Sequence, residues 1–211
     1  MKKQGILIVV SGFSGAGKGT IVKELMVTYP EHYALSVSAT TRNPRPGELD
    51  GKEYFFHTRE EFEEMIREDA LIEHAEYVKN YYGTPRAYVE EQMNAGKDVI
   101  LEIEIQGALK VREKFPEALL LFVSTPTADV LRSRLVGRGT EDMDTIRARL
   151  ARAVQEADGI ERYDYFVIND ALRACVEEVH AIVTGEHNRV SRNINYINHI
   201  REELSGFSKG E

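Results

Sequence analysis

The stretch GILIVVSGFSGAGKGT, residues 5–20, decides the fold of this chain. Its first half is a short apolar run, which is typical of a β-strand buried on both faces of a sheet. Gly12, Gly17 and Lys18 then follow at the spacing of a phosphate-binding loop, in which backbone N–H groups turn onto phosphate oxygens at the start of a helix. The alternative is a glycine-rich turn that binds nothing. We expect a buried strand, a phosphate-binding loop and a helix, in that order.

One position of the loop departs from the usual pattern. A serine or threonine normally follows the lysine and reaches Mg²⁺, whereas this chain has Gly19 there and a hydroxyl one residue later, on Thr20. Mg²⁺ loses water reluctantly, so phosphate oxygens and water can hold it without that side chain. Such a site suits nucleoside monophosphate kinases, because two phosphorylated substrates supply most of the oxygens. The letters GKGT also resemble adenylate kinase, so the loop alone leaves the acceptor open.

Strand-like and helix-like segments alternate along the rest of the chain. Such alternation implies a parallel sheet with helices on both faces, here an α/β, three-layer P-loop kinase fold. Further buried strands are expected at residues 98–105, 118–124 and 165–169. Helical patterns are expected at residues 17–29, 106–115, 128–136, 171–187 and about 189–204.

Two segments interrupt this alternation. Residues 36–83 contain a helix that opens with a Thr58-x-x-Glu61 capping box, and a strand that ends at the turn NYYGT, residues 80–84. We interpret them as an inserted small α+β subdomain. Residues 137–157 are polar and rich in arginine and acidic residues, which indicates a mobile lid. The core then comprises residues 1–35, 84–136 and 158–211.

Composition excludes several classes of protein. The chain has 42% hydrophobic and 29% charged residues and a formal net charge of −8, as expected of an ordinary globular protein that repels nucleic acid. No apolar stretch approaches the length of a membrane span. Cys175 is the single cysteine, which fits a reducing compartment such as the cytoplasm. We expect no nucleic-acid partner and no membrane association.

Three segments resemble guanylate kinase: SVSATTRNPRPGELDGKEY (residues 36–54), EHAEYVKNYYGT (73–84) and LEIEIQGA (101–108). GRGT at 137–140 and VIND at 167–170 match in the same order, and the resemblance runs from about residue 5 to 190. It implies ATP-dependent phosphorylation of GMP to GDP, and likewise of dGMP, in purine nucleotide metabolism. ATP, GMP and Mg²⁺ are the implied ligands, and residues 36–83 become a GMP-binding subdomain.

The acceptor site has a chemical basis in these segments. Arg42 and Arg45 flank a proline turn and can present two guanidinium groups to one phosphate. A carboxylate can accept from both the N1–H and the exocyclic amine of guanine, whereas adenine offers it a bare N1 lone pair; the resemblance assigns this carboxylate to Glu73. Each residue alone could equally be a surface charge or a packing side chain. The residues assigned to GMP are Ser38, Arg42, Arg45, Glu48, Tyr54, Glu73, Tyr82, Thr84 and Glu104.

Glu102 and Glu104 alternate with apolar residues, so we expect both carboxylates on one face of a central strand. Buried charges at a strand end are costly unless they meet cations or donors. The family usually has aspartates at both positions, which leaves their roles open. We assign Glu104 to the acceptor side and Glu102 to the water shell of the metal.

The remaining candidates surround the phosphates of ATP. Positioned cations stabilise the charge that phosphoryl transfer spreads over the equatorial oxygens, without a covalent step. The resemblance assigns this role to Lys18, Arg42, Arg134, Arg138 and Arg149, whereas Arg147 and Arg152 are interpreted as a solvated helix face. Asn169 is either a turn residue or a neighbour of adenine. The ATP set is Gly12, Phe13, Ser14, Gly15, Ala16, Gly17, Lys18, Gly19, Thr20 and Asn169.

Two other functions are compatible with parts of the sequence. A guanylate-kinase-like binding module keeps the fold but typically loses the working loop, which is intact here. A kinase for another nucleoside monophosphate would share the loop but not Glu73. Turnover with different acceptors discriminates between these alternatives.

Overall fold

The computed structural model describes residues 4–77, 79–137 and 143–208. Its main sheet has five strands in the order β2-β7-β1-β8-β9, and every neighbouring pair is parallel. The predicted parallel sheet is therefore confirmed. The strands are β1 (Leu7–Gly12), β2 (Tyr33–Leu35), β7 (Asp98–Glu102), β8 (Leu119–Ser124) and β9 (Tyr165–Ile168).

Helices cover both faces of this sheet, as three layers require. Alternate residues of β1 point to opposite faces: Ile8 belongs to one buried cluster and Val9 to another. Ile21 lies in the first cluster and Val111 in the second, so each face is sealed by helices. The helices of the first face are α1 (Lys18–Thr28) and α7 (Leu172–Glu186), and those of the second are α3 (Arg86–Asn94) and α4 (Ile105–Lys114).

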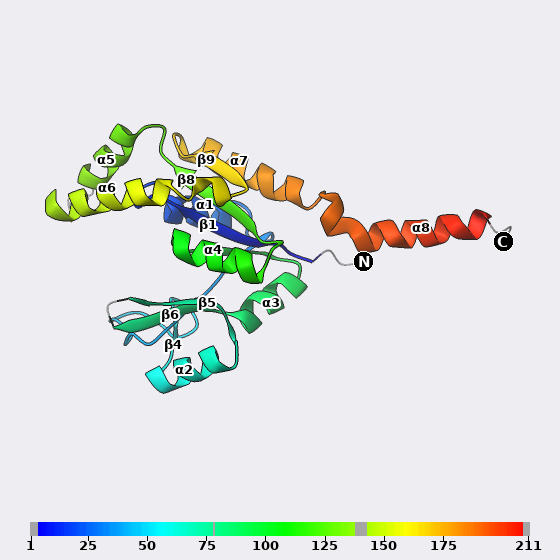
Figure 1. Ribbon diagram of the computed structural model, residues 1–211, viewed down its shortest axis with the longest axis horizontal. Coiled ribbons are helices and arrows are strands. Elements are labelled where there is room, and N and C mark those ends of the chain that lie inside the picture. The colour runs from blue at the N-terminus through cyan, green and yellow to red at the C-terminus, as the bar shows by residue number, and fades with distance from the viewer. Residues whose placement is uncertain (1–3, 78, 138–142, 209–211) are drawn as a thin grey trace.

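A second sheet of four strands lies beside the core (Figure 1). The capping box at its helix is present, since the Glu61 N–H donates to the Thr58 hydroxyl at 3.2 Å and the Thr58 N–H donates to the Glu61 carboxylate at 2.8 Å. Phe62 of that helix packs with Ala39 and Leu71 in a small core of its own. The elements are β3 (Ala39–Thr40), β4 (Phe55–Phe56), α2 (Arg59–Arg67), β5 (Leu71–Tyr77) and β6 (Asn80–Pro85).

The predicted turn NYYGT is wrong, because these residues form β6, which pairs antiparallel with β5 and β3. The chain reverses just before Asn80, where Lys79 has a φ of 62°. Asn and Gly are frequent in turns, but tyrosine and threonine favour a pleated, half-buried surface. Pairing on both edges outweighs the local turn preference.

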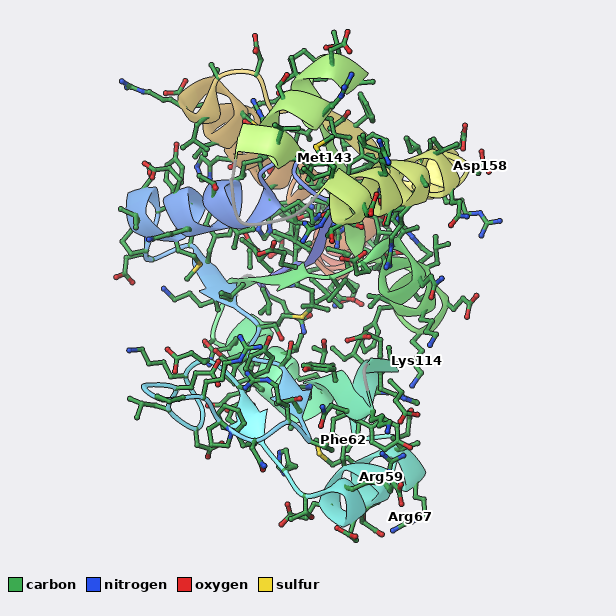
Figure 2. All side chains as sticks on the ribbon, turned by 90° about the vertical axis from the view of Figure 1, so that its left-hand side faces the viewer. Arg59, Phe62, Arg67, Lys114, Met143 and Asp158 are labelled. Atoms are coloured by element: carbon green, nitrogen blue, oxygen red, sulfur yellow. The ribbon has the colours of Figure 1, made fainter. Side chains whose placement is uncertain are left out.

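Two further helices lie at the opposite end of the molecule from α2. These are α5 (Ala128–Gly137) and α6 (Met143–Ala157), which share a buried apolar cluster. In Figure 2, Met143 marks the start of α6 and Asp158 follows its end in the upper part, and Arg59 and Arg67 mark the ends of α2 in the lower part. The core sheet therefore lies between the segment predicted to be a lid and the small subdomain. The division of the chain into core, subdomain and lid remains a prediction.

Several boundaries differ from expectation. The strand predicted at 98–105 ends at Glu102, and α4 already begins at Ile105. The strand β2 and the helix α3 were not predicted, because β2 has three residues and α3 buries only Val89. A short 3-10 turn, η1 (Ile160–Arg162), precedes β9. The last predicted helix consists of a 3-10 turn, η2 (Val190–Asn193), followed by α8 (Ile194–Ser208), which extends away from the core (Figure 1). In the described part of the chain no helix is long and apolar enough to cross a membrane.

Candidate functional site

The glycine loop joins β1 to α1 in the conformation that a phosphate site requires. Gly15 and Gly17 both have a φ of 95°, in the left-handed region that favours glycine. A Cβ on Gly17 would also lie 2.5 Å from the Asn169 amide nitrogen, so no side chain fits there. The Lys18 ammonium donates to the carbonyls of Gly12 at 2.7 Å and Phe13 at 3.2 Å. The loop thus curls around its own lysine at the carboxyl end of the sheet.

Two residues from elsewhere in the chain fix the loop. Asn169 is 5% exposed and donates from its amide to the Ala16 carbonyl at 2.8 Å. Arg134 donates to the Ala16 carbonyl at 3.3 Å and to the Asn169 carbonyl at 2.8 Å. Asn169 therefore holds the loop in place. Neither interpretation from the sequence, as a turn residue or as a neighbour of adenine, included this contact. An open pocket of about 450 Å³, here called the loop pocket, is lined by Gly15, Gly17, Thr20, Arg134, Gly137, Asn169, Asp170 and Leu172.

The helix α6 contacts the glycine loop and also the residue that precedes α4. Its Arg149 donates to the Ser14 hydroxyl at 2.9 Å, which brings a predicted cation onto the loop. Arg147 pairs with Asp144 at 3.2 Å on an exposed surface, as expected. Arg138, another predicted cation, lies outside the described residues.

Arg152 of the same helix is half exposed, as expected of a solvated helix face, but it also forms an ion pair across the fold. Its guanidinium lies 3.1 Å from Glu104 and 3.1 Å from Glu156, so it joins α6 to the residue that precedes α4. Burial raises the pKa of Glu156, and the Glu104 charge adds to this rise. The sequence shows Arg152 and Glu156 as an i, i+4 pair on a helix. It does not show that Arg152 also meets Glu104.

The predicted phosphate-binding residues of the acceptor lie together on the small subdomain. Arg42 pairs with Glu48 at 3.0 Å, and its guanidinium lies 5.3 Å from the centre of the Tyr54 ring. The Arg45 N–H donates to Glu48 at 2.7 Å. These two donors, Arg42 first, hold the pKa of Glu48 below its usual value. The rings of Tyr54 and Tyr82 meet edge to face at 6.0 Å, so both tyrosines lie beside Arg42.

Glu73, the carboxylate that the sequence assigns to the acceptor, is buried. It is 9% exposed and accepts a hydrogen bond of 2.9 Å from the Thr84 hydroxyl. Burial raises its pKa, a rise that the Thr84 hydrogen bond and the Lys110 charge oppose. A Cβ on Gly107 would lie 3.4 Å from the second carboxylate oxygen. The glycine of the α4 segment therefore allows α4 to approach Glu73 closely.

A smaller pocket of about 160 Å³, here called the acceptor pocket, lies between the two sheets. Three of the residues assigned to GMP, namely Ser38, Tyr54 and Thr84, line it, and Glu102 lines it as well, whereas Glu73 is not among its lining residues. The other lining residues are Leu35, Ser36, Glu53, Leu101 and Ile103.

The expectation that Glu102 and Glu104 project from one strand is wrong. Glu102 is the last residue of β7, whereas Glu104 stands between β7 and α4 and pairs with Arg152. Burial raises the pKa of Glu102, while the charge of Lys18 opposes this rise. The structure thus brings Glu102 to the junction of the loop and the acceptor pocket. The assignment of Glu104 to the acceptor remains a prediction.

Metal binding at this junction would need ligands beyond the protein. In residues 4–77, 79–137 and 143–208, no group of three or more His, Cys, Asp and Glu side chains could hold an ion. Glu102 provides a single carboxylate beside Lys18 and Gly19. That donor set fits Mg²⁺ bound mainly by substrate phosphates and water.

Comparisons with known proteins agree over nearly the whole chain. The family model for guanylate kinase matches residues 4–186. The guanylate kinase of Bacillus anthracis is 50% identical over 202 residues, 96% of this chain and 98% of the relative. That of Lactococcus lactis subsp. lactis is 48% identical over 204 residues, 97% of this chain and 99% of the relative. The crystal structure of guanylate kinase from Anaplasma phagocytophilum matches with a TM-score of 0.70 and 31% identity over 91% of each chain.

Proposed function

The chain belongs to the guanylate kinase family, enzymes that phosphorylate GMP with ATP, and on this premise we propose how and on what it acts. The reaction is an in-line transfer from ATP in the loop pocket to GMP or dGMP in the acceptor pocket. It serves purine nucleotide metabolism. The reducing cytoplasm is the proposed location, and the lone, buried Cys175 supports it.

The observation that carries the acceptor assignment is the buried pair of Glu73 and Thr84. A carboxylate in a dry site needs donors, and guanine offers two adjacent ones in its N1–H and amine. Adenine would leave the carboxylate facing a lone pair. A polar site matched to one base in this way rejects the other by on the order of 10⁴-fold.

The cations of the chain provide positioning and charge stabilisation. Lys18 is held by the loop carbonyls and Arg149 by Ser14, which supports the proposal that both meet the transferred phosphoryl group. Arg42 is the proposed ligand of the GMP phosphate. Arg134 belongs to the same proposed catalytic set. Arg138 belongs to it as well, and is assigned only from the resemblance of the sequence to the family. These groups stabilise equatorial charge without forming a covalent bond.

Mg²⁺, when bound, neutralises part of the phosphate charge and orients the phosphates. Glu102 is the residue of this chain proposed to face it. We further propose that residues 36–83 and 137–157 close on the substrates. Closure would exclude the water that otherwise hydrolyses ATP.

The experiment that tests this proposal is a coupled assay of ADP release. ATP and Mg²⁺ are supplied with each of GMP, dGMP, AMP, UMP and dTMP in turn. We expect turnover with GMP and dGMP alone. Turnover chiefly with AMP would contradict the role of Glu73, and binding of GMP without turnover would favour a binding module.

A further inference from the structure

Gly19 lies directly beside the Glu102 carboxylate. A Cβ built on Gly19 would lie 3.3 Å from each carboxylate oxygen and 3.7 Å from the carboxyl carbon. Gly19 is the second residue of α1, and its φ is not among the positive values that favour glycine. The glycine at this position therefore provides space rather than an unusual backbone conformation.

The Glu102 side chain approaches the loop from the neighbouring strand. Glu102 pairs in register with Val10 of β1, two residues before the loop begins at Gly12. Among the described residues, its carboxylate forms no hydrogen bond or ion pair, although the Lys18 charge acts on it. Glu102 is exposed at the end of β7, so its carboxylate is accessible to a hydrated cation bound at the loop.

We propose that Glu102 supplies the protein oxygen that a hydroxyl at position 19 supplies to the divalent cation in the usual loop pattern. The missing side chain of Gly19 leaves the space that this carboxylate occupies. A serine hydroxyl would stand one bond beyond a Cβ that already lies 3.3 Å from both oxygens, so the two groups compete for one place. Mg²⁺ is commonly bound by one or two carboxylates together with substrate phosphates.

The test exchanges the two groups and measures metal affinity without turnover. Mn²⁺ binding is followed by electron paramagnetic resonance, with saturating non-hydrolysable ATP analogue and no acceptor. The proteins are the wild type, Glu102→Ala, Gly19→Ser and the double variant. Loss of the carboxylate should weaken Mn²⁺ binding by at least about tenfold.

The exchange makes a specific prediction about the serine. Gly19→Ser should restore most of the lost Mn²⁺ affinity in the Glu102→Ala background and should bring no gain when Glu102 is present. An equal effect of the serine in both backgrounds would mean that the two groups act independently, and would overturn the proposal. Unchanged affinity in Glu102→Ala would overturn it as well.

Two further variants control for indirect effects. Glu104→Ala removes the neighbouring carboxylate, which Arg152 holds, and should leave Mn²⁺ affinity within about twofold. Thermal unfolding without metal shows whether Glu102→Ala folds. If it does not fold, Glu102→Gln, which keeps the side-chain volume, replaces it in the measurement of Mn²⁺ affinity. An effect of Glu104→Ala as large as that of Glu102→Ala would refute a specific ligand.

This inference rests on the proposed function, but the two can fail separately. If the wild type phosphorylates GMP while all variants bind Mn²⁺ equally, only the role of Glu102 is wrong. If Mn²⁺ binding depends on Glu102 while GMP is not phosphorylated, the inference holds and the proposed reaction is wrong.

Discussion

The Thr84 hydroxyl donates a 2.9 Å hydrogen bond to the buried carboxylate of Glu73. The two residues lie on β5 and β6, the hairpin of the small subdomain. Gly107 permits the α4 segment to approach the second carboxylate oxygen. One acidic group is therefore enclosed by the subdomain and the core together, and this burial raises its pKa.

Glu73→Gln should erode the preference for GMP over AMP. An amide presents a donor to one of the guanine donors, and an unmatched buried group costs about 1–3 kcal/mol. We expect kcat/KM for GMP to fall on the order of tenfold to a hundredfold, with a smaller loss or a gain for AMP. Glu76→Gln is the matched control, since Glu76 lies on the same strand and is exposed. Wild-type activity of Glu73→Gln with GMP would contradict the base-recognition scheme.

The raised pKa of Glu73 predicts a pH-dependent stability. Its pKa lies above the ordinary value of 4.5 in the folded chain, so the unfolded chain loses the proton first as pH rises. Protonated Glu73 therefore contributes to the free energy of unfolding. This contribution is complete below about pH 4.5 and is lost as pH rises through the folded pKa. The free energy of unfolding of Glu73→Gln, relative to that of the wild type, should rise with pH. Urea unfolding of both proteins between about pH 4.5 and pH 8 measures it, and a constant difference would contradict the prediction.

Lys18→Ala should nearly abolish turnover while leaving the fold intact. The ammonium rests on two loop carbonyls and is the charge proposed to meet the transferred phosphoryl group. We expect kcat to fall on the order of 10³-fold. Lys23→Ala, on the exposed side of the same helix, should retain wild-type kcat. Thermal unfolding of both variants checks that neither result reflects loss of structure.

Arg152→Ala and Arg147→Ala should differ, although the sequence alone does not separate these residues. Arg152 connects α6 to Glu104, whereas Arg147 pairs with Asp144 on the surface. Because the Arg152 pair is half exposed, we expect its loss to change KM for GMP or kcat by up to about fivefold. Arg147→Ala should leave both constants unchanged. Equal steady-state kinetics of the two variants would argue against a link between α6 and the acceptor side.

Gly17→Ala should disturb the loop through both backbone and packing. Its φ of 95° and the 2.5 Å approach of the Asn169 amide leave no room for a methyl group. We expect a loss of stability of about 1–3 kcal/mol and a raised KM for ATP. Gly185→Ala is the control, because a Cβ in that part of α7 meets nothing within 4 Å and should stabilise the helix by about 0.5–1 kcal/mol. Chemical denaturation and ATP titration measure the two effects.

Features carried by neighbouring residues were predictable from the sequence. The capping box of Thr58 and Glu61 and the glycine conformations of the loop are local, and each depends on residues within one turn. The parallel sheet follows from buried strands that alternate with helices. The acceptor residues were assigned by resemblance, which remains a prediction, and three of them, Ser38, Tyr54 and Thr84, line one pocket.

Contacts between distant segments were decided only by the tertiary structure. No pattern places Glu102 beside Gly19, or Arg152 beside Glu104, because each contact depends on where a strand ends and how a helix crosses it. The end of β7 at Glu102 separates two carboxylates that period-two alternation assigns to one face. Likewise, pairing with two neighbouring strands makes β6 of residues whose local preference is a turn. The sequence by itself determined the strand, the loop and the kinase family, since these rest on local chemistry and order along the chain. The tertiary structure decided which charges meet, since that depends on packing between elements.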